Sequence, residues 1–201
     1  MPRRIRTATG GLVYHVLNRG VARQDVFDDD ADFVAFERVM AQALRREPGM
    51  RLLGYCLMSN HWHMVLRPTK NGQLSEFMRW LTVTHTQRLH AHRHSAGTGP
   101  VYQGRFKSFP IETDEHLCTV LRYVERNALS AKMVKRAEDW RWGSLWRWVN
   151  RQRAVGRGED LPSLSDWPVE RPHQWRRLVN KALTDAETHA VRLSIRRSVP
   201  F

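Results

Sequence analysis

The chain has 201 residues, of which 33 are Lys or Arg and 20 are Asp or Glu, so its formal net charge is +13. A balance this basic indicates a polyanionic partner, with nucleic acid ahead of an anionic membrane surface. The two cysteines lie far apart and no run of about 18 apolar residues occurs, which excludes a disulfide framework, a cysteine-based zinc site and a membrane-spanning helix.

The first predicted elements are a strand and an amphipathic helix. Residues 12–18 alternate between apolar and polar side chains and end at Arg19-Gly20, as in a strand closed by a turn. Aspartates gathered between positions 25 and 32 then precede apolar residues at helical spacing from Phe33 to Leu44. Carboxylates suit the start of a helix, so we interpret residues 28–30 as caps and exposed charge, although a carboxylate metal site has the same composition.

A hairpin, a second helix and a further strand follow. Residues 50–58 and 61–67 are nearly continuous apolar runs, which predicts two central strands covered on both faces, joined by a turn at Ser59-Asn60. Apolar residues from Leu74 to Leu81 predict a second helix that ends in the basic stretch 87–94. Beyond a Gly/Pro-rich break, residues 101–111 predict another strand.

A third helix is predicted over residues 114–131, with Leu117, Leu121, Val124 and Ala128 as its apolar stripe. The element order predicts an α+β fold: a ferredoxin-like (RRM-like) β-α-β-β-α-β sheet with a helix after it. Beyond about residue 135 the chain becomes rich in Trp and Arg, with a loop predicted at 151–162 and a final helical segment at 173–194.

The tripeptide His61-Trp62-His63 is the sharpest local motif. On a strand, residues i and i+2 point to the same face, so both imidazoles project together while Trp62 points away. Two imidazoles side by side suit one divalent metal, yet the same pattern is common as a pair of polar residues on an open strand face. A metal would need a third ligand, and neither cysteine is an obvious one.

The third helix offers two further candidates. Tyr123 and Asn127 are an i, i+4 pair, and therefore neighbours on one face of the helix, about a quarter-turn from its apolar stripe. A helical tyrosine is usually a half-buried aromatic at the edge of the core, and an asparagine there is usually a surface amide. Beside two histidines on a basic chain, the pair also allows a nucleophile with a metal ligand one turn away.

Several motifs in order resemble a known family. LMSNHWHMV at 57–65 resembles the histidine–hydrophobic–histidine segment of single-tyrosine HUH transposases. YQGRFKS at 102–108 and YVERN at 123–127 resemble the two stretches that follow it, and YHVLNRG at 14–20 also fits. DWRWGS at 139–144 resembles the Trp-x-Trp-Ser-Ser element of the branch called REP-associated tyrosine transposases, or RAYTs. The similarity spans most of residues 10–150; it departs at Ala128, where the family usually has proline.

The resemblance implies a metal-dependent single-stranded DNA endonuclease and strand-transferase. Tyr123 would be the nucleophile that forms a 5′-phosphotyrosine link, and His61, His63 and Asn127 would bind magnesium or manganese. Residues 1–137 would form the HUH catalytic domain, and residues 138–201 a Trp/Arg-rich helical extension and tail. The partner would be single-stranded DNA near a REP-like hairpin, handled by a monomer or homodimer in the cytoplasm and associated with the nucleoid, with no membrane partner.

Basic and aromatic side chains are the candidate DNA contacts. Four tryptophans between 140 and 148 alternate with arginines, which offers base-stacking planes and phosphate contacts; the other interpretation is that the tryptophans pack this segment onto the domain. Basic residues at 79–93 of the second helix form a weaker set, which includes Arg93. The full set of predicted DNA contacts is Arg19, Arg79, Arg105, Lys107, Lys135, Arg136, Arg141, Trp142 and Arg147.

Two other functions use the same residues differently. The β-α-β-β-α-β order is also that of the RRM, so a non-catalytic single-stranded nucleic-acid-binding protein is the alternative, although no pair of RNP-like aromatic strand motifs is found. A hydrolytic phosphodiesterase would instead use the histidines as acid and base, and its activity would survive the loss of Tyr123 and of metal.

Overall fold

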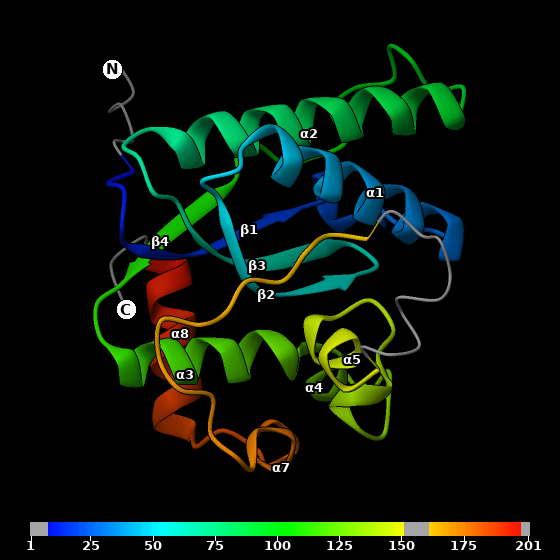
Figure 1. The fold of residues 1–201 in the computed structure, drawn as a ribbon. Coiled ribbons are helices and arrows are strands. Elements are labelled where there is room, and N and C mark those ends of the chain that lie inside the picture. Colours follow the sequence, from blue (N-terminus) through cyan, green and yellow to red (C-terminus); the bar gives the residue numbers. More distant parts are fainter. Residues whose placement is uncertain (1–7, 151–160, 198–201) are drawn as a thin grey trace.

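The computed structural model describes residues 8–150 and 161–197, and it confirms the predicted element order (Figure 1). The strands form one antiparallel sheet in the order β2-β3-β1-β4, which is the ferredoxin-like arrangement. The elements of this unit are β1 (Val13–Arg19), η1 (Val21–Arg23), α1 (Asp30–Arg46), β2 (Arg51–Met58), β3 (His61–Arg67), α2 (Gln73–His92) and β4 (Lys107–Ile111).

Helices cover both faces of the sheet. α1 and α2 lie on one face, and α3 (Asp114–Glu125) and α8 (Asp185–Arg197) lie on the other (Figure 1). The strands β2 and β3 are buried along almost their whole length, as their continuous apolar sequences predict. The side chains of one β3 face therefore meet α1 and α2, and those of the other face meet α3.

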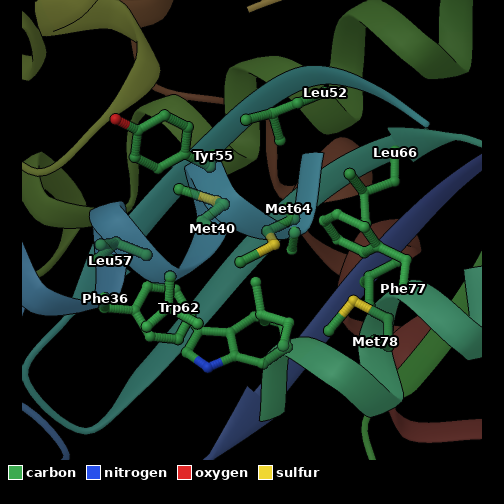
Figure 2. Close-up of a cluster of buried hydrophobic side chains, with 14 of the residues drawn as sticks. Phe36, Met40, Leu52, Tyr55, Leu57, Trp62, Met64, Leu66, Phe77 and Met78 are labelled. Atoms are coloured by element: carbon green, nitrogen blue, oxygen red, sulfur yellow. The ribbon is translucent and has the colours of Figure 1, made fainter. Parts of the chain in front are cut away.

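The core under α1 and α2 fixes which side chains of β3 face which way. Trp62, Met64 and Leu66 are fully buried there against Phe36 of α1 and Phe77 of α2 (Figure 2). Each side chain of this size contributes about 1.5–3 kcal/mol when it is buried. Because side chains alternate along a strand, burying these three leaves the two histidines of β3 facing α3.

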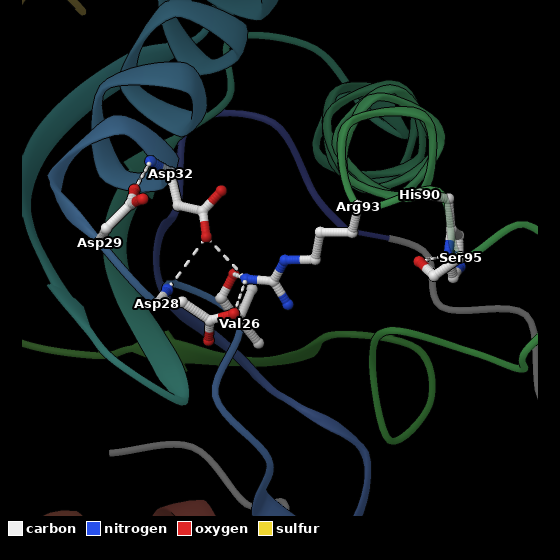
Figure 3. Close-up of polar contacts among 7 residues, drawn as sticks. All are labelled: Val26, Asp28, Asp29, Asp32, His90, Arg93 and Ser95. Carbon is white, nitrogen blue, oxygen red and sulfur yellow. Dashed lines mark hydrogen bonds and ion pairs between the residues drawn. The ribbon is translucent and has the colours of Figure 1, made fainter.

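The aspartates before α1 supply a cap and exposed charge, as expected, and they also take part in ion pairs that the sequence did not predict. The Asp29 side chain accepts a hydrogen bond from the Asp32 backbone N–H (3.0 Å) at the start of α1. Arg93, at the end of α2, bridges the carboxylates of Asp28 (3.0 Å) and Asp32 (2.6 Å) and also donates to the Val26 carbonyl (Figure 3). The guanidinium of Arg93 is thus engaged in joining the two helices, away from the α3 face.

Before the C-terminal part of the chain, two predicted elements have the wrong extent. The strand expected over residues 101–111 is only β4; before it, a single bridge pairs Tyr102 with Gly20, and the Tyr102 hydroxyl bonds with His85 Nδ1 (2.9 Å). These tertiary contacts hold the segment to the end of β1 without a ladder. The helix expected over 114–131 stops at Arg126, whose ψ of −5° ends α3, and α4 (Asn127–Ser130) follows.

The C-terminal part packs on the α3 side and along the free edge of β2. Its elements are η2 (Ala137–Asp139), α5 (Ser144–Val149), α7 (Trp175–Asn180) and α8. The Leu57 N–H donates to the Trp142 carbonyl (2.9 Å) and the Ser165 N–H to the Leu52 carbonyl (2.8 Å), so this part of the chain covers the outer edge of the sheet. The division between residues 137 and 138 stays a prediction.

The single helix expected over 173–194 is two helices, because residues 181–184 separate α7 from α8. Most of the loop predicted at 151–162 lies outside the described residues, as do the arginines at 151, 153 and 157. Among the described helices, none combines the length and the apolar character needed to cross a membrane.

Candidate active site between the sheet and the third helix

The two histidines of β3 share the sheet face that α3 covers, as their spacing predicts. Their ring centroids are 5.1 Å apart, and His63 is buried while His61, at the start of the strand, is half-buried. On the neighbouring strand β1, Arg19 pairs in register with His61, and Leu17 pairs with His63. The motif therefore forms one imidazole cluster at the start of β3, with a cation beside it.

A third histidine, which the sequence interpretation left without a role, completes this cluster. His15 of β1 places Nε2 2.9 Å from Nδ1 of His63, and both side chains are buried. The Nδ1 of His61 is likewise held, at 2.7 Å from Oδ1 of Asn60. In His61 and in His63 the Nδ1 atom has a partner that fixes the orientation of the ring. The Nε2 atom of each ring is then the nitrogen that can bind another ligand.

The surroundings of the cluster favour neutral imidazoles. Burial lowers the pKa of His15 to about 3, and burial together with the charge of Arg19 lowers the pKa of His61 to about 4. Burial, with the neighbouring histidines and Arg19, also holds the pKa of His63 well below its usual value. Neutral imidazoles keep a free lone pair, which is the form that coordinates a metal.

Tyr123 projects from α3 onto the same cluster. Its ring lies edge-on to His63, with centroids 5.7 Å apart, and to His15, with centroids 6.2 Å apart. The α3 stripe that holds it there is buried as predicted. Burial raises the pKa of the Tyr123 hydroxyl, and a hydrogen bond from Arg192 of α8 and the charge of Arg19 lower it in part. Two cations therefore face the hydroxyl, where they would stabilise a phenolate.

Asn127 reaches the cluster from the start of α4. Its side chain forms a hydrogen bond with His61, so the amide predicted as a ligand does lie beside one of the two predicted imidazoles. The structure thus brings Tyr123, His61, His63 and Asn127 together from β3 and the α3–α4 junction. It adds His15 and Arg192, which the sequence interpretation did not assign.

The α3–α4 junction is held by the C-terminal part of the chain. Glu125, buried, accepts hydrogen bonds from Ser144 Oγ (2.6 Å) and from Trp175 Nε1 (2.6 Å). The neighbouring Arg126 donates to the carbonyls of Val179 (2.9 Å) and Asn180 (2.6 Å) at the end of α7. Glu125 and Arg126 lie between the candidate residues Tyr123 and Asn127, so these contacts fix the position of the junction against α5 and α7.

The donor set fits a divalent cation. Two neutral imidazoles with oriented rings supply nitrogen, and the Asn127 amide can supply an oxygen. Among the described residues, no group of three His, Cys, Asp or Glu side chains is arranged to hold a metal. Such a mixed nitrogen and oxygen set is open to solvent ligands and to a phosphate oxygen.

Six of the nine predicted DNA contacts lie at three places on the fold. Arg19 lies at the cluster, and Arg105 and Lys107 are exposed on the segment that the Gly20–Tyr102 bridge holds near the end of β1. Lys135 and Arg136 are exposed beyond α4, where Arg136 is ion-paired with Glu138. Arg79 lies on α2, on the opposite side of the sheet, in an exposed ion pair with Glu76.

The remaining predicted contacts serve the fold. Trp142 is 6% exposed and stacks on Phe33 with ring centroids 4.8 Å apart, so the prediction that it offers a base-stacking plane is wrong for this structure. Arg141 pairs with the buried carboxylate of Glu37 (3.2 Å) and stacks on Trp142. Arg147 donates to the Pro162 carbonyl and adds positive charge near Glu37.

Comparisons with known proteins identify the family of the chain and structures with a similar fold. A family model described as "Transposase IS200 like" matches residues 8–127. A solved structure of the REP-associated tyrosine transposase bound to a REP hairpin is similar at a TM-score of 0.56 and 18% identity, over 86% of this chain and 98% of that one. A candidate transposase from Deinococcus radiodurans R1 gives a TM-score of 0.42 and 17% identity, over 62% of this chain and 96% of that one. No curated protein sequence matches significantly.

Proposed function

Since the chain belongs to the IS200-like transposase family, we propose that it cleaves and rejoins single-stranded DNA through a covalent bond to Tyr123. The observation that supports this most strongly is the meeting of Tyr123 with the oriented pair His61 and His63 and with Asn127. A nucleophile and a metal-ligand set that come from different elements of the fold converge on one point. That is the geometric requirement for attack on a bound phosphate.

The cleavage step uses the phenol oxygen of Tyr123 as the nucleophile. This oxygen attacks the scissile phosphorus in line, the bond between phosphorus and the 3′ oxygen breaks, and the departing oxygen takes up a proton to become a 3′-hydroxyl. The DNA phosphate remains as a 5′-phosphotyrosine ester. In the reverse direction a 3′-hydroxyl attacks this ester and releases the tyrosine, which rejoins the strand to a new end.

The residues around Tyr123 prepare it for this step. Arg192 and Arg19 offset part of the effect of burial, which raises the pKa of the Tyr123 phenol above its ordinary value of about 10, and they favour the phenolate. His61, His63 and Asn127 would hold Mg²⁺ or Mn²⁺, with His15 and Asn60 orienting the two rings. A bound metal would polarise the phosphate and offset its developing negative charge.

We further propose that the substrate carries a hairpin, as in the RAYT branch. The support is the shared fold with a transposase whose structure holds a REP hairpin, together with the motif DWRWGS at 139–144. Because the described chain presents one candidate nucleophile, cleavage of two DNA ends would take two subunits or two successive turnovers. A monomer or a homodimer, and a nucleoid location in the cytoplasm, follow as parts of this proposal.

The structure argues against the two other functions. An RRM binds RNA on an open sheet face, whereas both faces of this sheet are covered by helices. Burial lowers the pKa of His15 to about 3 and that of His61 to about 4, so both imidazoles are neutral at pH 7 and lack the second proton that a general acid of a hydrolytic phosphodiesterase would donate.

A covalent-adduct assay tests the proposal. The protein is incubated with Mn²⁺ and a hairpin oligonucleotide that has single-stranded flanks and a label at its 3′ end, and the products are separated on a denaturing gel. We expect a labelled protein band that is lost in EDTA and absent in Tyr123→Phe. The matched control is Tyr102→Phe, which removes a buried hydroxyl from the other face of the sheet and should leave the band. Cleavage without metal, or an adduct in Tyr123→Phe, would contradict the mechanism.

A further inference from the structure

The four tryptophans of the Trp/Arg-rich segment have different surroundings. Trp142 is in the core, Trp140 donates its indole N–H to the Leu57 carbonyl (2.8 Å), and Trp146 lies under the Arg141 guanidinium, 4.5 Å from ring centroid to Cζ. Trp148, at the end of α5, is different because its exposed fraction is 41%. An exposed tryptophan is unusual enough to call for an explanation.

Trp148 opens onto a pocket of about 510 Å³ between α5 and α7. Next to Trp148, Val149 contributes an apolar wall that is itself 38% exposed. The other lining residues come from α7 and the turn before it, and none of them is acidic: His173, Gln174, Arg176 and Arg177. An aromatic plane thus stands opposite two guanidinium groups.

The charge around this pocket is positive. Arg177 donates only a long hydrogen bond, 3.4 Å, to the neutral Gln174 side chain, and Arg176 lies 3.7 Å from a Glu138 carboxylate oxygen. A further guanidinium, that of Arg171, is placed 4.6 Å from the centroid of the Trp148 ring. The ring therefore already stacks with one planar cation while it remains exposed to the pocket.

We propose that this pocket binds one nucleotide of single-stranded DNA outside the cleavage site. The unpaired base stacks on Trp148 beside Val149, and Arg177 and Arg176 bind the adjacent phosphate. Stacking of this kind requires a base without a Watson–Crick partner, which is why the ligand is single-stranded. The identification of the polymer as DNA rests on the proposed function; the pocket itself does not use Tyr123 or the metal ligands.

The fold ties this pocket to the candidate active site. α7 carries Arg176 and Arg177, and its last two residues accept the hydrogen bonds of Arg126 at the α3–α4 junction. Trp175, also in α7, donates to Glu125, two residues after Tyr123. A strand held in the pocket would therefore keep a fixed position relative to the nucleophile, which would add affinity and restrict which phosphate is cleaved.

Photo-crosslinking tests the contact directly. The probe is a 12-nucleotide oligothymidylate in which 5-iodo-2′-deoxyuridine replaces thymidine, and the protein is Tyr123→Phe in EDTA, so that no covalent chemistry of the active site contributes. After irradiation and trypsin digestion, we expect the nucleotide on the peptide at 148–151, WVNR, whose only aromatic residue is Trp148. Crosslinks that are confined to other peptides would overturn the proposal.

Binding measurements on the same probe give the second test. We expect Trp148→Ala to weaken affinity at least about fivefold, and Arg177→Gln to lower the slope of log affinity against log salt by about 0.7, the value for one phosphate of a single strand. The matched controls are Val83→Ala and Arg38→Gln, exposed on α2 and α1 on the other side of the sheet, and they should change neither quantity.

If Trp148→Ala binds the oligothymidylate within about twofold of the parent protein, and its circular dichroism spectrum is unchanged, the proposal that the pocket binds a nucleotide is refuted. The two proposals fail separately. If the pocket proposal is wrong, the Tyr123-dependent adduct still forms while the crosslink lies elsewhere. If the proposed function is wrong, no adduct forms while the Trp148 crosslink persists.

Discussion

Replacing His15 by leucine should weaken Mn²⁺ binding by about 10- to 100-fold, the usual loss when the partner that orients a metal-binding histidine is removed. In the structure His15 Nε2 lies 2.9 Å from His63 Nδ1, and both side chains are buried, so water cannot readily replace the lost partner. That loss equals about 1.4–2.8 kcal/mol of binding free energy. Leaving Nδ1 of His63 unpaired should also cost about 1–3 kcal/mol of folding stability.

The assay is isothermal titration of the DNA-free protein with MnCl₂, with unfolding by urea measured in parallel. His15→Gln offers a replacement hydrogen bond to His63 and should recover part of the affinity. His85→Leu is the matched control, because it removes an equally buried, hydrogen-bonded histidine on the α2 side and should leave Mn²⁺ binding unchanged. Unchanged Mn²⁺ affinity in folded His15→Leu, or an equal loss in His85→Leu, would refute the reasoning.

The other predictions concern stability and the tyrosine. Burial lowers the pKa of His85 to about 4 in the folded protein, whereas the unfolded chain binds this proton at about pH 6.5. The free energy of unfolding therefore falls as the pH drops from about 6.5 towards 4. Between pH 7 and 5.5 this residue should account for about 1 kcal/mol, which urea titrations of His85→Gln should lack. Trp142→Ala should lower the free energy of unfolding by about 3–5 kcal/mol in the same assay, because the side chain lies in the core. A negligible loss would contradict this structural role and favour a DNA contact. Glu125→Leu leaves two buried donors unpaired and should cost at least about 2 kcal/mol, more than Glu125→Gln; equal losses would argue against the network. Arg192→Gln removes a charge that favours the Tyr123 phenolate, so the pH profile of adduct formation should move to higher pH, whereas an unmoved profile would exclude this role.

Most of the fold followed from patterns within single elements. The apolar runs at 50–58 and 61–67 have no polar alternation, and the structure buries both strands on two sides. The errors arose where tertiary contacts replace local pattern. Residues 101–106 have strand-like composition, but the buried hydroxyl of Tyr102 and one bridge to Gly20 hold them instead of a ladder. At Arg126, where α3 ends, the side chain donates to carbonyls of α7, more than 50 residues away.

The sequence predicted only those parts of the candidate site that depend on the spacing of residues within one element. His61 with His63, and Tyr123 with Asn127, are short-range pairs, and the fold brings these pairs together. His15 meets His63 only through the register of β1 and β3, and Arg192 reaches Tyr123 only through the packing of α8, so neither was assigned. Composition also could not show that the fold engages Arg141 and Trp142, through the buried carboxylate of Glu37 and the ring of Phe33 respectively.

The most direct test of the central claim is to identify the amino acid that carries the DNA. After reaction of the wild-type protein with hairpin DNA and Mn²⁺, nuclease and trypsin digestion leave a nucleotide on one peptide, which mass spectrometry can sequence. We expect the nucleotide on the phenol oxygen of Tyr123, in the peptide YVER at 123–126. A nucleotide on any other side chain, or cleaved DNA with no modified peptide, would contradict it.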